Sequence, residues 1–155
     1  MLEKDVEDAI VSAVDGLAIQ GLVVRGSWQV AAAGLVKGAE GDCTAALVVK
    51  VAPRSFPTFG ICEVDLAVTL ALAVRADLDA DGAKLVEYTD AIGELIQGWN
   101  LVEAGDELTD LSVPGVFEPG GVQVTGGTGP EFENGAWTVV QNLTLRGTVP
   151  HGNNE

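Results

Sequence analysis

The chain has 155 residues, of which 47% are hydrophobic and 20% are charged. This balance is typical of a globular protein with one ordinary core, and it excludes a disordered segment. The 23 acidic residues outnumber 8 basic ones, which gives a formal net charge of -15. Because so acidic a surface repels phosphate backbones, no nucleic-acid partner is expected. Solubility is the simpler explanation of the charge, and an acidic face for a basic partner or a cation is the alternative.

The chain carries no signal for secretion or for a membrane. Residues 1–8 are acidic, whereas a secretory signal begins with positive charge, and no uncharged stretch is as long as a transmembrane helix. Cys43 and Cys62 are too few for a disulfide framework or a zinc site. We expect free thiols in a reducing compartment, although the two would form a disulfide if their Cα atoms lie within about 7 Å.

A helix is expected over residues 2–18, because apolar residues recur there at helical spacing on one face. Glu3, Asp5, Glu7 and Asp8 crowd its first turns, where negative charge complements the positive end of the helix dipole.

Two strands should follow this helix. Residues 22–30 predict the first, interrupted by Gly26, and residues 31–43 are small and glycine-rich, as in a loop. Residues 44–51 predict a short second strand, which ends before Pro53 because prolines cannot donate to a sheet ladder.

The clearest pattern covers residues 61–75. Apolar residues alternate strictly with polar or small residues, a period of two that a helix does not produce. At roughly 3.3 Å per residue such a strand spans about 50 Å, more than one small domain usually needs. The strand therefore either bends or bulges midway, or projects at one end, where its edge would pair with a neighbouring subunit.

The second half predicts a helix over residues 82–98 and a connector over residues 100–115 that contains a short strand around Leu101 and Val102. Strands at 116–125 and 136–149 then flank a glycine-rich hairpin tip at 126–135. We thus predict a single α+β domain over residues 1–149, with a mostly antiparallel sheet of about five strands and two helices packed on one face, and a flexible polar tail at 150–155.

One motif suggests a metal. Asp77, Asp79, Asp81 and Gly82 match the opening of an EF-hand calcium loop, but the twelfth position holds Tyr88 where the loop needs a bidentate acid. An aspartate-rich start to the following helix explains the same residues. We therefore expect no cofactor and at most weak cation binding at the three aspartates.

No catalytic site is expected. Glu63 and Asp65 share one face of the long strand about 7 Å apart, a spacing found in glycosidases but common on any solvated strand. The sole histidine, His151, lies in the tail, and Cys43 has no base beside it. Neither glycine-rich segment has the ending or the following helix of a phosphate-binding loop.

The order of elements resembles the tail terminator (tail completion, minor tail) proteins of long-tailed bacteriophages and prophages. The matching pieces are VEDAIV at 6–11, CEVDLAV at 62–68, the helix at 85–99 and the last strand at 136–148. The resemblance covers most of the chain as a pattern of elements, without a signature motif.

The resemblance implies a non-enzymatic structural protein of virion assembly. Such a protein forms a hexameric ring, caps the tail tube and joins tail to head. Its partners are other copies of itself, the tail-tube protein and the head–tail connector protein, and it resides in the virion tail or, during assembly, in the host cytoplasm. The expected interface residues are Glu63, Asp65, Arg75, Gly126, Gly127, Thr128, Glu131, Phe132 and Glu133.

Two alternatives remain open. A head–tail connector or neck protein of a phage shares the size and the assembly role. From a different class, a small acidic calcium- or ligand-binding module would use the aspartates at 77–81.

Overall fold

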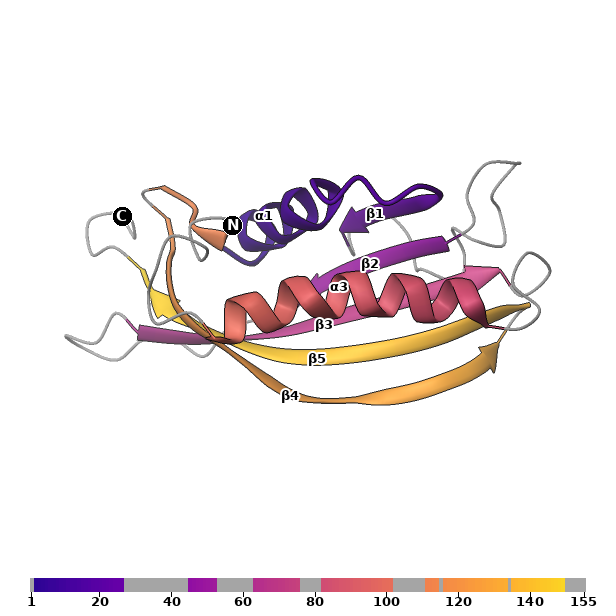
Figure 1. Ribbon diagram of the computed structural model, residues 1–155. Helices are drawn as coiled ribbons and strands as arrows, with labels where there is room; N and C mark the ends of the chain where they lie inside the picture. Colours follow the sequence, from indigo (N-terminus) through magenta and orange to yellow (C-terminus); the bar gives the residue numbers. More distant parts are fainter. Residues whose placement is uncertain are drawn as a thin grey trace.

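The computed structural model describes residues 2–26, 45–52, 63–75, 82–101, 111–114, 116–133 and 135–149. The elements, in chain order, are α1 (Leu2–Asp15), β1 (Leu22–Gly26), β2 (Ala45–Val51), β3 (Glu63–Arg75), α3 (Ala83–Leu101), β4 (Glu118–Glu133) and β5 (Ala136–Thr148). The strands form one sheet in the order β1-β2-β3-β5-β4, in which β1 and β2 are parallel and the other pairs antiparallel. The predicted α+β class with a mostly antiparallel sheet is confirmed (Figure 1).

The two helices cover one face of the sheet and bury the main core. Alternate residues of β3, from Val64 to Val74, point into this core together with the apolar stripes of both helices. The intervening residues of β3 face the opposite side, where the described residues bury a small apolar cluster formed by Ala46, Val48, Ala73 and Ala136. The alternation that predicted β3 therefore reflects a sheet with one helix-covered face.

The length of β3 is explained by its partner. β5 pairs with β3 without a break from Glu63↔Thr148 to Arg75↔Ala136, whereas β2 pairs only with residues 68–74 of β3. β3 thus extends past the end of β2 and remains supported by β5 on its other side. The end of β3 beyond β2 belongs to the main core through Val64 and Leu66, and the expected pairing of its edge with a neighbouring subunit stays a prediction.

The helix ends differ from the predicted ones. α1 stops at Asp15 instead of residue 18, because Leu17 N–H bonds to the carbonyl of Val14 and Ala18 adopts φ 52°. α3 continues to Leu101, so the short strand expected around Leu101 is wrong at that residue, and Val102 lies outside the described residues. Trp99, which is 1% exposed, continues the buried stripe of α3 and favours the longer helix.

The predicted hairpin tip at 126–135 is also wrong. β4 continues through it to Glu133. Of the three register shifts in its pairing with β5, one lies just before Gly126 and one spans Gly129 and Pro130. Gln141 Nε2 donates to the carbonyl of Gly126 at 2.7 Å, and Thr138 Oγ1 donates to that of Glu131 at 3.2 Å. β4 stays extended despite its glycines and Pro130, because pairing and side-chain hydrogen bonds from β5 hold its backbone.

Within the residues that the structure describes, no helix combines the length and apolarity needed to cross a membrane.

Candidate functional site

Several residues singled out in the sequence lie outside the described residues. They are Cys43, Cys62, Asp77, Asp79, Asp81 and His151. Among the residues that are described, no group of three or more His, Cys, Asp or Glu side chains is placed to hold a metal ion.

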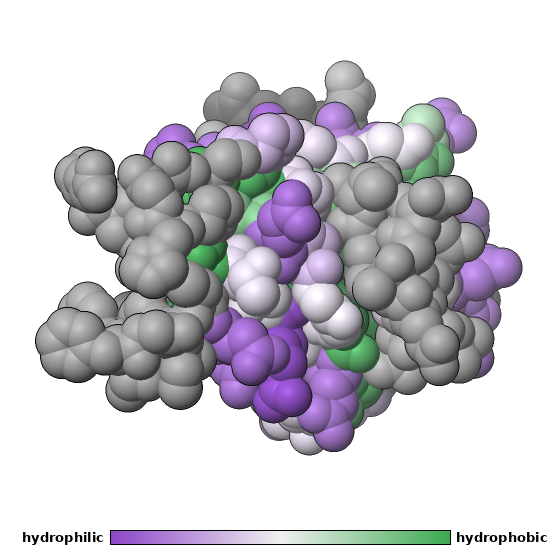
Figure 2. All heavy atoms as spheres, turned by 90° about the vertical axis from the view of Figure 1, so that its left-hand side faces the viewer, coloured by the Kyte–Doolittle hydropathy of each residue, from purple (hydrophilic) through white to green (hydrophobic). Residues whose placement is uncertain are grey.

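Glu63 and Asp65 lie at the start of β3 on the sheet face away from the helices. Both are exposed, and Arg146 on β5 donates from Nε to Asp65 Oδ1 at 2.9 Å. This hydrogen bond raises the pKa of Arg146, and the charges of Asp65 and Glu63 add to the rise. Figure 2 faces this end of the molecule, where hydrophilic side chains gather over its lower half. Of the two carboxylates, that of Asp65 is thus bound to the guanidinium of Arg146, on an exposed face of the sheet.

We expect the variant Asp65→Asn to leave the stability unchanged within error, because an ion pair half exposed to water contributes little. The hydrogen bond and the charge of Asp65 raise the pKa of Arg146, so the guanidinium stays charged at neutral pH, and on the alkaline side its contribution is lost only as the pH rises through the raised value. Urea unfolding at neutral pH measures the effect. A large loss would show that the pair fixes the β3–β5 register.

The predicted interface residues separate into two groups. Glu63 and Asp65 lie at one end of the sheet, and the others extend from its middle, where residues 126–128 pair with residues 140–142 of β5, to its other end. At that other end, Arg75 and Glu133 both pair with Ala136 of β5. Twelve strand positions of about 3.3 Å, or about 40 Å, separate Glu63 from Arg75, so the predicted residues do not form one site.

The second group lies on β4, the last strand in the sheet order. Residues 123–132 of β4 are exposed, and no strand in the described part of the chain pairs with its outer edge. Phe132 is 62% exposed and meets Trp137 edge to face, with ring centroids 5.3 Å apart. The sequence prediction therefore named exposed positions here, although it placed them in a loop.

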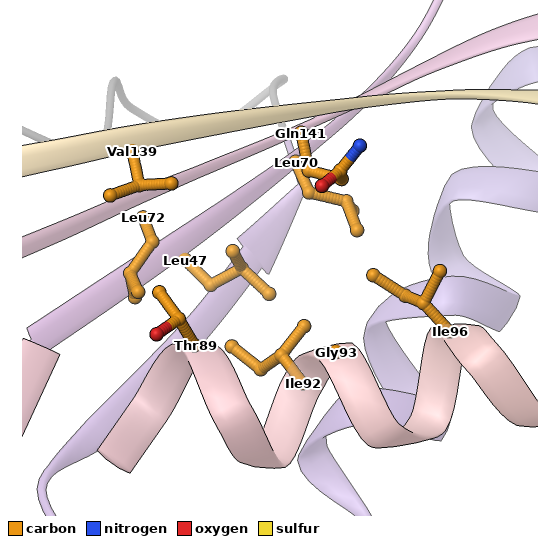
Figure 3. A pocket seen from close by; sticks show the side chains of 9 residues that line it. All are labelled: Leu47, Leu70, Leu72, Thr89, Ile92, Gly93, Ile96, Val139 and Gln141. Atoms are coloured by element: carbon orange, nitrogen blue, oxygen red, sulfur yellow. The ribbon is translucent and has the colours of Figure 1, made fainter. Parts of the chain in front are cut away.

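A pocket that the sequence did not predict lies between α3 and the sheet (Figure 3). Its volume is about 80 Å³, and side chains of α3 and of the sheet point toward one another across it. It is lined by Leu47, Leu70, Leu72, Thr89, Ile92, Gly93, Ile96, Val139 and Gln141. The one sequence signal for it is Gly93, which leaves the flank of α3 without a side chain where it passes over β5.

A buried acid was missed as well. Glu7 is 1% exposed, and its Oε2 accepts a hydrogen bond from the backbone N–H of Val51 at 3.2 Å. The carboxylate lies over Gly26, where a Cβ would approach its Oε1 to 2.5 Å. Glu7 therefore joins α1 to the ends of β1 and β2, a role that the sequence did not predict.

The fold and its exposed surfaces define an α+β protein with a five-stranded mixed sheet and one long edge strand. Comparison with protein-family models gives no match, and comparison with curated proteins gives none either.

Proposed function

We propose that the protein is a tail terminator of a long-tailed phage, a structural protein that assembles into a ring on the tail tube and acts without catalysis. The observation that carries the proposal is β4, an edge strand of 16 residues with an outer edge that no described strand covers. An edge of this length is a template for pairing between subunits. The resemblance in element order supplies the biological setting.

Two further features support assembly. β3 and β5 are paired over 13 residues, so the sheet provides a long, continuous support for contacts at both of its ends. The acidic surface would keep free subunits apart until a tube surface of complementary charge brings them together.

The proposal predicts a ring of six subunits or binding to the tail-tube protein. Size-exclusion chromatography with multi-angle light scattering measures the first, and co-sedimentation with assembled tail tubes measures the second. A protein that is monomeric at every concentration and does not bind tubes would contradict the proposal.

A pair of charge variants localises the contact. Thr128→Lys places a charged side chain on exposed β4 and should disrupt the ring or the binding to tubes. Ser12→Lys makes the same change in charge on an exposed position of α1 and should preserve both. Equal behaviour of the two variants would exclude β4 as the contact.

A further inference from the structure

The pocket beneath α3 borders the helix-side face of the β4–β5 hairpin, where residues of β4 are exposed. Thr89 and Gly93 of α3 form one wall, and Val139 and Gln141 of β5 form the floor. Gly127 of β4 pairs with Gln141 and is exposed, so no side chain closes the pocket on that side. We call the pocket together with this face of the hairpin the α3–β5 groove.

Exposed apolar side chains border the α3–β5 groove on both sides. Val86, 57% exposed, precedes Thr89 and Gly93 by three and seven positions and therefore lies on the same flank of α3. Val124 and Phe132, 44% and 62% exposed, lie on the helix side of β4, because their partners Leu143 and Trp137 pack against the main core.

These three residues are unusual in the protein. Four large hydrophobic side chains are exposed in the described part of the chain, and the fourth, Leu17, follows α1. An apolar patch that gathers around a groove in this way is typical of a docking surface.

The dimensions fit a helix. From Val124↔Leu143 to Phe132↔Trp137 the groove follows six positions of β5, which is about 20 Å. A helix of about 14 residues has this length, and its diameter of about 10 Å matches the span of two strands beside α3. A strand added at the outer edge of β4 would pair with its backbone and would leave this face of the hairpin open.

The charge around the groove selects the partner. α3 and β4 carry three acidic residues each, and β5 carries none. The basic residues of these three elements are Lys84 of α3 and Arg146 of β5. Asp90 and Glu94 are exposed on α3, whereas Glu131 pairs with Thr138 and faces the other side of the sheet. A helix from a second copy would bring further negative charge, because α1 carries five acidic residues and one basic residue.

We propose that the α3–β5 groove binds an amphipathic helix of a partner protein, with Leu-type side chains toward Val86, Val124 and Phe132 and Lys or Arg at its margins. Burial of the apolar face supplies the affinity, and the exposed acidic residues of α3 orient the helix. The inference rests on the groove alone and holds whether or not the protein forms a ring.

The test uses the full chain and a fluorescein-labelled peptide of about 14 residues, composed of Leu and Lys at helical spacing. Fluorescence anisotropy should show saturable binding. An isomeric peptide, with the same Leu and Lys in alternation, should bind at least about tenfold more weakly, because it cannot present one apolar face as a helix.

Variants of the protein localise the binding without changing its charge. The double variant Val86→Ser and Phe132→Ser should weaken the binding of the helical peptide at least about tenfold. Leu17→Ser removes an exposed apolar side chain elsewhere and should leave the affinity within about twofold. Circular dichroism confirms that each variant is folded, as expected for exposed positions.

Three results would overturn the proposal. Equal binding of the two peptides would mean that charge alone attracts them, and equal effects of Leu17→Ser and the double variant would place the contact elsewhere. Self-association that the double variant abolishes, without uptake of the peptide, would make a second copy the occupant. If the protein formed no ring and did not bind tail tubes but still bound the helical peptide, the tail terminator proposal would be rejected and the proposed helix-binding groove would stand.

Discussion

Replacing Glu7 by alanine is expected to lower the free energy of unfolding by about 3 kcal/mol. The side chain is 1% exposed, and its carboxylate accepts a hydrogen bond from the N–H of Val51 in a buried place. The shorter side chain would leave that N–H without its acceptor and would open a cavity over Gly26, where no Cβ fills the space. Urea unfolding followed by circular dichroism measures the loss.

Two variants serve as controls for Glu7→Ala. Glu7→Gln keeps an acceptor oxygen and most of the volume, so its loss should be clearly smaller. Asp8→Ala removes the neighbouring carboxylate, which is 61% exposed and pairs with Lys4 at 3.4 Å, and should be nearly neutral. If Glu7→Ala were as mild as Asp8→Ala, the carboxylate would not hold α1 to the sheet.

The sequence assigned Glu7 to the acids that complement the dipole of the first helix, because it stands among three other acids. Its position in the helix indicates burial instead. Glu7 lies three residues before Ile10 and seven before Val14, on the flank of the buried stripe. Composition outweighed periodicity in that prediction. The partner at Val51 lies 44 residues away and follows only from the fold.

Periodicity predicted β3 and α3 well because a single buried face shapes both patterns. The sequence missed the continuation of β4 for the opposite reason. Residues 126–130 contain three glycines and a proline, which favour a turn locally, yet pairing with β5 keeps them extended through bulges. Such a partner is non-local information, and no pattern within the segment contains it.

The same reasoning applies to the candidate surfaces. The predicted interface residues between Gly126 and Phe132 of β4 are exposed, because turn-type residues and edge-strand residues share polarity and small size. The α3–β5 groove could not be predicted, since it requires the order β3-β5-β4 and the placement of Gly93 over β5. The sequence therefore identified exposed positions without their geometry.

The second large effect is expected from Gly147→Ala in β5, which should lower the free energy of unfolding by about 3 kcal/mol. Gly147 is buried, and a Cβ there would collide with the carbonyl oxygen of Glu118 and with the ring of Phe117. The carbonyl belongs to the backbone of the paired strand, and the ring is 0% exposed, so neither group can move without disturbing its neighbours.

Gly121→Ala is the matched control for Gly147→Ala, because it adds the same methyl group to the same strand pair and meets nothing within 4 Å. It should change the free energy of unfolding by no more than about 0.5 kcal/mol. Combining Gly147→Ala with Phe117→Leu removes the aromatic ring from the collision but leaves the carbonyl oxygen in place. The double variant should therefore lose somewhat less stability than the sum of the losses in the two single variants. If the double variant were no less stable than Phe117→Leu alone, the ring alone would exclude a side chain at position 147. If Gly147→Ala lost no stability, β4 and β5 would separate more easily here than their close backbone approach implies.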